Sequence, residues 1–118
     1  MTDLLEVPFV SAIVPCRNEE DFIGKCIDSL IDCDYPKEYL EILIVDGMST
    51  DETRQIIENY VQRNAFVHLL DNPKKILASA WNIGIRQSKC AIIMGLNAHA
   101  VFVPKYISLC IKYLREYK

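Results

Sequence analysis

Apolar residues along the chain form two kinds of pattern that alternate. Some runs are apolar almost throughout, as in strands buried on both faces, and these runs cover residues 9–15, 40–45, 66–70 and 90–96. After each run, apolar residues recur every three or four positions, which is typical of a helix with one buried side. The pattern therefore predicts the order β-α-β-α-β-α-β-α.

The predicted helices carry recognisable start signals. Asn18 is the expected N-cap of the first helix, which precedes the strand at 40–45. Ser49-Thr50-Asp51-Glu52 has the form of a capping box, so a second helix is expected to open there. A third helix is predicted over residues 76–87, and a fourth over 104–117.

Buried strands that alternate with amphipathic helices indicate a fold class. Such strands form a mainly parallel sheet with helices on both faces, so the chain is expected to be α/β and Rossmann-like. A chain of 118 residues is long enough to bury one hydrophobic core. Residues 1–118 are therefore expected to form a single domain.

Composition and charge exclude several classes of function. The 13 Lys and Arg against 16 Asp and Glu give a net charge of −3, so no basic surface for nucleic acid is expected. No apolar run approaches the ~18 residues that span a bilayer, and the acidic N-terminus lacks the apolar region of a secretory signal. The five cysteines are scattered and lack a C-x-x-C pair, which favours free thiols in a reducing, cytoplasmic compartment.

Polar residues follow each predicted strand directly. Ligands of open α/β sheets bind beyond the carboxyl ends of the strands, so these loops are the candidate site. They place five residues on one rim, namely Arg17, Asp46, Lys75, Asn97 and His99. This mixture of cations, a carboxylate, an amide and a histidine suits an anionic ligand that carries a base. The glycine-rich loops of NAD-binding and P-loop proteins are absent from the sequence.

Several of these segments resemble a known family. Ala12–Glu20 and then Ile44–Asp51 look like the opening of a family 2 glycosyltransferase with the GT-A fold. Three shorter motifs continue the match in the correct order: Asn72-Pro73-Lys74-Lys75, Asn82-Ile83-Gly84 and Asn97-Ala98-His99. The likeness covers residues 9–108 and is greatest to the subgroup that builds bacterial exopolysaccharides such as succinoglycan.

The resemblance implies that residues 1–118 are the N-terminal, nucleotide-sugar-binding half of a longer enzyme. Such an enzyme transfers a sugar from a nucleotide-sugar, here expected to be a UDP-sugar, to a polysaccharide or lipid-linked acceptor with inversion. The general base is expected beyond Lys118, so no catalytic residue is assigned within the chain and the piece alone is expected to bind without turnover. Association of the parent protein with the cytoplasmic face of a membrane is a further expectation.

The same resemblance implies roles for individual residues. The expected contacts with the donor nucleotide come from Pro15, Arg17, Glu19, Asp46 and Lys75. Asn97 and His99 stand where the family holds a divalent metal, Mn²⁺ or Mg²⁺, on the diphosphate. An amide in place of the usual carboxylate neutralises no charge, so a weakened metal site is expected, and the imidazole of His99 favours Mn²⁺.

Two other interpretations are kept beside this one. The chain could be a non-catalytic nucleotide-binding module in which Asn97 has replaced the metal ligand. A flavodoxin-like or receiver-type signalling domain has the same order of elements, and Asp71 stands where its phosphoacceptor would, but the paired acids after the first strand are missing. His68 and Trp81 are expected to be structural, the first packed or on an edge strand and the second in the core.

Overall fold

The computed structural model describes residues 7–89 and 92–116. Its strands are β1 (Val10–Cys16), β2 (Leu40–Asp46), β3 (Val67–Asp71) and β4 (Ile92–Gly95). Its helices are α2 (Ile23–Ile31), α3 (Thr53–Arg63), α4 (Leu77–Gln87) and α5 (Tyr106–Glu116), with a short 3-10 helix, η1 (Lys37–Tyr39). The predicted alternation of strands and helices is confirmed. Residues 90 and 91, the first two of the predicted fourth strand, lie outside the described residues.

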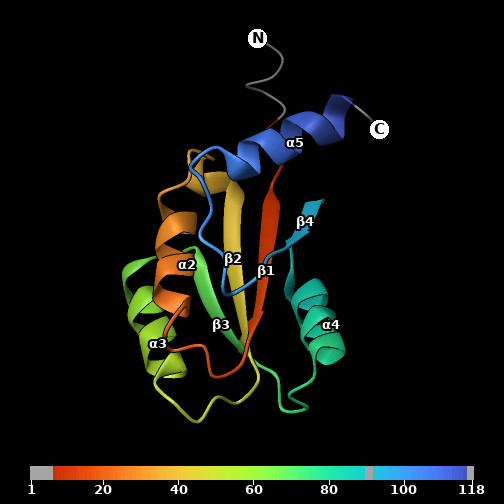
Figure 1. The fold of residues 1–118 in the computed structure, drawn as a ribbon. Coiled ribbons are helices and arrows are strands. Elements are labelled where there is room, and N and C mark those ends of the chain that lie inside the picture. The colour runs from red at the N-terminus through yellow and green to blue at the C-terminus, as the bar shows by residue number, and fades with distance from the viewer. Residues whose placement is uncertain (1–6, 90–91, 117–118) are drawn as a thin grey trace.

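The four strands form one parallel sheet in the order β3-β2-β1-β4 (Figure 1). Ala12 in β1 lies between Ile42 in β2 and Met94 in β4, which fixes the register at the centre. The chain builds outward from β1 to β3 and then returns to the other side of β1. This reversal makes the junction of β1 and β4 a topological switch point, as in Rossmann-like sheets, whereas a flavodoxin-like sheet has the order 2-1-3-4-5. The signalling-domain interpretation is therefore wrong.

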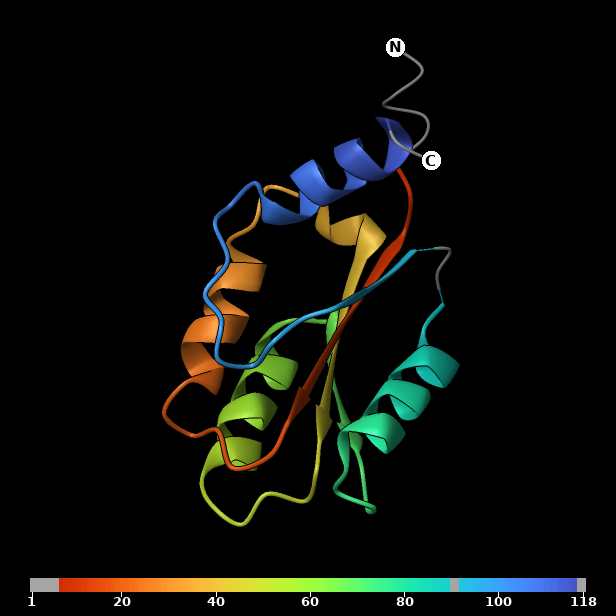
Figure 2. The same cartoon turned by 45° about the vertical axis from the view of Figure 1, so that its right-hand side comes forward.

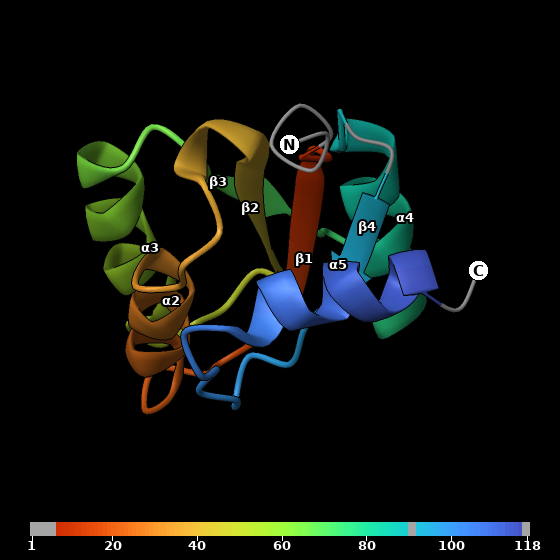
Figure 3. The ribbon, with the colours of Figure 1, turned by 90° about the horizontal axis from the view of Figure 1, so that it is seen from above.

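Helices cover both faces of the sheet, as predicted (Figures 2 and 3). Helices α2 and α3 lie on one face, over the main core that centres on Val14, Ile27, Ile42 and Ile44. Helix α4 packs on the other face, against β1 and β2. Helix α5 lies across the amino ends of the strands, away from the end where the polar loops gather (Figure 1).

Two glycines let α4 lie close to the sheet. A Cβ added to Gly84 of α4 would stand 2.6 Å from Cγ2 of Ile13 in β1. A Cβ added to Gly95 at the end of β4 would stand 2.7 Å from the ring of Trp81. Trp81 is partly buried against the smaller core on this face, in line with its predicted structural role.

The predicted helix starts were wrong for the first two helices. Helix α2 begins at Ile23 without a side-chain cap, because the Asn18 side chain binds the loop after β2 instead. Helix α3 begins at Thr53, because the Ser49 hydroxyl donates to Asp46 rather than capping the helix. Asn18 thus bonds across to the loop after β2, whereas Ser49 bonds back to Asp46, three residues earlier.

The described cysteines are free thiols, as predicted, with Cys16, Cys26 and Cys33 buried and Cys110 partly buried. Cys90 lies outside the described residues. The predicted reducing, cytoplasmic compartment stays a prediction.

His68 lies in β3, an edge strand, as predicted. In the parts of the chain that the structure describes, every helix is too short or too polar to cross a membrane.

Candidate functional site

The loops after β1 and β2 are tied together by hydrogen bonds. Nε of Arg17 donates to the carbonyl of Gly47 over 2.9 Å, and the backbone N–H of Asn18 donates to Oγ of Ser49 over 2.8 Å. The N–H of Thr50 donates in turn to Oδ1 of Asn18, whose φ of 54° is one that asparagine tolerates better than most residues. The two loops therefore form one unit at the carboxyl end of the sheet.

Asp46 is the centre of this unit. The Asp46 side chain is fully buried. It accepts hydrogen bonds from the N–H of Ser49 (2.9 Å), from the Ser49 hydroxyl (2.5 Å) and from Nη1 of Arg54 (2.9 Å). Nη2 of Arg54 lies 2.8 Å from Asp71, so one guanidinium joins the ends of β2 and β3. The hydrogen bonds to Asp46 and Asp71 raise the pKa of Arg54. Burial and the nearby Asp46 carboxylate raise the pKa of the Cys16 thiol.

The loop after β4 reaches the start of α2. Nε2 of His99 lies 3.0 Å from Oε2 of Glu19, and the imidazole lies 4.8 Å from the Phe22 ring between centroids. The N–H of His99 donates to Oδ1 of Asn97 over 2.8 Å. The Cys26 thiol donates to the Asn97 carbonyl over 3.7 Å, and burial raises the pKa of Cys26 to about 11.

A hollow of about 320 Å³ opens at the switch point, beside the ends of β1 and β4. Its lining includes Pro15 and Glu19 from the β1 side, Leu77 and Trp81 from α4, and Asn97 from the loop after β4. Apolar walls with a few polar groups are typical of sites for small ligands. The switch point is also where open α/β sheets bind their ligands.

The predicted site residues fall into three places. Pro15, Glu19 and Asn97 line the hollow, and His99 joins them through Glu19. Arg17 lies beside them on the loop after β1, with its side-chain stem against Gly47.

Two predicted donor contacts lie apart from the hollow. The carboxylate of Asp46 is enclosed, so a ligand could reach it only if Ser49 or Arg54 moved. Lys75 is exposed in the loop after the edge strand β3, with a φ of 65° and its N–H bonded to the carbonyl of Asn72. Neither position tests the expected contact with a nucleotide, and both roles stay predictions.

Metal-ligating groups are few. Among the residues that the structure describes, no three His, Cys, Asp or Glu side chains gather as a metal site would need. The candidate donors are Nδ1 of His99, which the contact with Glu19 leaves free, and the amide oxygen of Asn97. This donor set fits a divalent ion whose ligands are mostly diphosphate oxygens. The protein would add one imidazole nitrogen.

Sequence reasoning missed the contact between Glu19 and His99 and the bridge made by Arg54. Both contacts join residues of different loops, and the motif patterns name each residue separately. A weak signal for Arg54 existed, since it lies in the first turn of the helix that follows the Asp46 loop.

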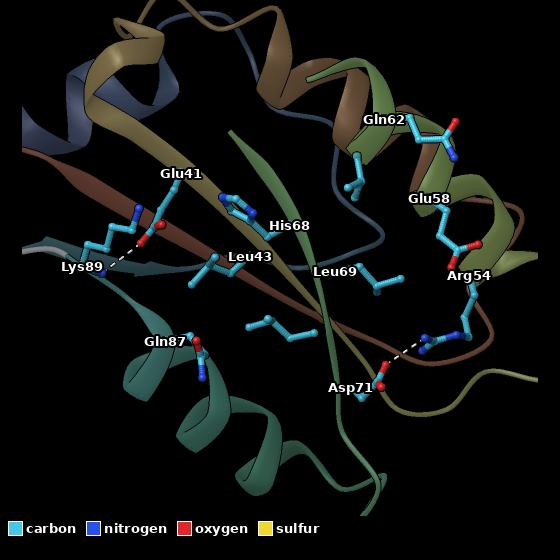
Figure 4. Close-up of a pocket in the computed structure, with 12 residues that line it drawn as sticks. Glu41, Leu43, Arg54, Glu58, Gln62, His68, Leu69, Asp71, Gln87 and Lys89 are labelled. Atoms are coloured by element: carbon cyan, nitrogen blue, oxygen red, sulfur yellow. Dashed lines mark hydrogen bonds and ion pairs between the residues drawn. The ribbon is translucent and has the colours of Figure 1, made fainter. Parts of the chain in front are cut away.

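A larger hollow, of about 750 Å³, lies along the outer edge of β3 (Figure 4). Its lining includes the acids Glu41, Glu58 and Asp71 against the cations Arg54 and Lys89. Arg54 is already paired with Asp71, and the N–H of Lys89 donates to Glu41. These acids would repel a diphosphate, so this hollow suits a nucleotide less well than the switch point does.

Comparison with known proteins identifies the family. The profile of Glycosyl transferase family 2 matches residues 11–118. A relative from Methanococcus voltae, dolichyl N-acetyl-alpha-D-glucosaminyl phosphate 3-beta-D-2,3-diacetamido-2,3-dideoxy-beta-D-glucuronosyltransferase, is 38% identical over 94 residues. That match covers 78% of this chain and 29% of the relative, so the chain spans less than a third of the relative's length.

Solved structures share the fold. Mannosyltransferase PcManGT from Pyrobaculum calidifontis, solved with GDP-Man and Mn²⁺, has a TM-score of 0.85 and 27% identity, over 91% of this chain and 32% of that one. S. aureus TarS 1-349 in complex with UDP has a TM-score of 0.78 and 23% identity, over 92% of this chain and 32% of that one. The predicted Rossmann-like half of a GT-A fold is therefore confirmed. With the profile covering nearly all of its length, the chain belongs to glycosyl transferase family 2.

Proposed function

We propose that residues 1–118 are the donor-binding part of a longer glycosyltransferase. The whole enzyme would transfer a sugar from a nucleotide-sugar, preferably a UDP-sugar, to a polysaccharide or lipid-linked acceptor with inversion. The observation that supports this best is the hollow between the ends of β1 and β4, where the polar loops of both strands meet. The family membership and the nucleotide-bound neighbours agree with a nucleotide-sugar donor.

The loops after β1 and β2 supply the proposed nucleoside contacts. Pro15 forms part of the wall of the hollow. The Nε of Arg17 is held by Gly47, which leaves its two terminal nitrogens for the base or the diphosphate. Asp46 would act indirectly, by holding the loop that carries Ser49. Lys75 would reach toward the diphosphate from the start of the segment that leads into α4.

Asn97 and His99 are proposed to face the diphosphate and its divalent ion. When bound, such an ion stabilises the negative charge of the leaving diphosphate as a Lewis acid. Because the Asn97 amide carries no charge, the affinity for the ion should be lower than at a site with a carboxylate. The general base is proposed to lie in the rest of the enzyme, and the chain alone should bind the donor without turnover.

A second candidate function is a nucleotide-binding module without catalytic activity. The observation that favours it is that Oδ1 of Asn97 already accepts the N–H of His99, and this turn needs no metal. Such a module would bind UDP equally well with and without a divalent ion.

A thermal-shift series with UDP, GDP and ADP, each with and without Mn²⁺, tests the proposal. A ligand that binds the folded state raises its stability in proportion to ln(1 + [L]/Kd). We expect a UDP-selective shift that Mn²⁺ increases.

R17A should weaken UDP binding about tenfold, through loss of charge-assisted hydrogen bonds. R86A removes an exposed arginine of α4 and serves as the matched control. A UDP shift that ignores Mn²⁺ would favour the module, and no shift with any nucleotide would contradict both candidates.

A further inference from the structure

The contacts of His99 set which of its ring nitrogens is left for a ligand. We propose that Glu19 is a positioning residue that holds Nε2 of His99, so that Nδ1 is the nitrogen presented to the metal and diphosphate. This inference rests on the proposed function and adds to it a role for Glu19 that differs from the nucleoside contact expected from the family resemblance.

The imidazole is held from two sides. Oε2 of Glu19 lies 3.0 Å from Nε2, and the Phe22 ring lies 4.8 Å from the imidazole with a tilt of 59°. The side chain of His99 is 55% exposed, while that of Glu19 is 17% exposed. The carboxylate is thus the more enclosed partner, and the imidazole is fixed on one edge while the other edge stays open.

Glu19 is itself anchored to the scaffold. Its backbone N–H donates to Oγ1 of Thr53 over 2.8 Å, and Thr53 is fully buried at the start of α3. The Thr53 hydroxyl donates onward to Asp51 over 2.5 Å. The backbone of Glu19 is therefore held by the start of α3, which limits where its carboxylate can lie. Such support helps a carboxylate to orient a ligand histidine.

The contact with Glu19 determines which tautomer a neutral His99 ring adopts. A neutral ring has one N–H and one bare nitrogen, and a carboxylate accepts a hydrogen bond but cannot donate one. Nε2 must therefore carry the hydrogen, which leaves Nδ1 as the bare nitrogen. A bare imidazole nitrogen is the form that binds a metal ion. Removing a carboxylate that is paired in this way with a ligand histidine typically lowers the metal affinity by about 10- to 100-fold.

The tautomer can be measured without any ligand. The sequence contains two histidines, His68 and His99, so long-range ¹H–¹⁵N spectra of the neutral rings can be assigned with the H68Q variant. We expect His99 to be protonated on Nε2 in the wild-type chain. E19Q offers an amide that can either accept from Nε2 or donate to it, so E19Q, like E19A, should give a mixture of tautomers. D21A removes an exposed carboxylate of the same loop and should change nothing. A ring protonated on Nδ1, or no response to E19A, would overturn the inference.

The second step adds Mn²⁺ with UDP. The paramagnetic ion should broaden the ring signals of His99 and leave those of His68 sharp, and E19A should weaken Mn²⁺ binding by about tenfold. If UDP binds but His99 is not broadened, the assignment of Nδ1 to the metal is overturned while donor binding stands. If His99 has the expected tautomer but UDP does not bind, the proposed function fails and the positioning by Glu19 is supported on its own.

Discussion

The loop after β2 and the loop after β4 end at the same edge of the sheet, yet they are held very differently. The first is built around Asp46, whose buried carboxylate accepts bonds from Ser49 and Arg54. The second places the exposed side chains of Asn97 and His99 on a short turn, where Nε2 of His99 contacts Glu19. One loop is part of the scaffold, and the other presents its polar groups to solvent.

This difference separates two tasks that the motifs alone do not distinguish. A buried and fully bonded carboxylate fixes the shape of a loop, whereas partly exposed groups with free lone pairs can bind a ligand. We therefore attribute to Asp46 the shape of the nucleoside side of the site. We attribute direct contact with the diphosphate and its ion to the loop after β4.

The largest expected effect comes from removing the centre of the β2 loop. D46A leaves Nη1 of the partly buried Arg54 and the N–H and hydroxyl of Ser49 without their acceptor, so the free energy of unfolding should fall by about 3 kcal/mol. Urea denaturation measures this change. D71A removes the exposed carboxylate that binds the same guanidinium and should cost less than about 1 kcal/mol. Equal costs for the two variants would contradict the contrast drawn here.

A smaller effect is expected where the β4 loop meets α2, at the thiol of Cys26. Burial raises its pKa from 9.0 to about 11, so its contribution to stability is present below pH 9 and is lost as the pH rises toward 11. The difference in unfolding free energy between the wild type and C26A should therefore shrink by about 2 kcal/mol over this interval. C110A, in α5, is the control for loss of a thiol. A difference that stays constant with pH would rule out this role of Cys26.

The smallest effect concerns the ligand side of the β4 loop. N97D keeps the acceptor for the His99 N–H and adds a carboxylate, so Mn²⁺ should bind in the presence of UDP about tenfold more tightly, or ~1.4 kcal/mol. Isothermal titration measures this affinity. N59D adds the same charge on α3, away from the site, and should leave the affinity unchanged. An unchanged affinity in N97D would show that position 97 does not meet the ion.

The strands were predictable because each is a run of apolar residues bounded by a turn signal. The predicted run 40–45 became β2, Leu40–Asp46, and 66–70 became β3, Val67–Asp71. Helix caps were not predictable in the same way. The side chain of Asn18 accepts the N–H of Thr50, and the hydroxyl of Ser49 donates to the nearby Asp46 and accepts the N–H of Asn18. These contacts outcompete the capping pattern.

The candidate site was predictable as a set of loops but not as a set of contacts. Parallel strands bring their carboxyl ends to one edge, so the placement of Arg17 and Asn97 on that edge followed from the order of elements. The burial of Asp46 depends on Arg54 of α3, and the orientation of His99 depends on Glu19, 80 positions earlier in the chain. Contacts of this kind arise from packing, which periodicity does not encode.

The most direct test of the account is to map UDP on the chain by amide chemical shifts, with Mg²⁺ as a diamagnetic ion. The central claim is that the nucleotide binds at the switch point. We predict that the amides of Arg17, Gly47 and Asn97 shift on addition of UDP, while those of His68 and Lys89 at the β3 edge do not. Shifts concentrated at the β3 edge, or none at saturating UDP, would contradict the claim.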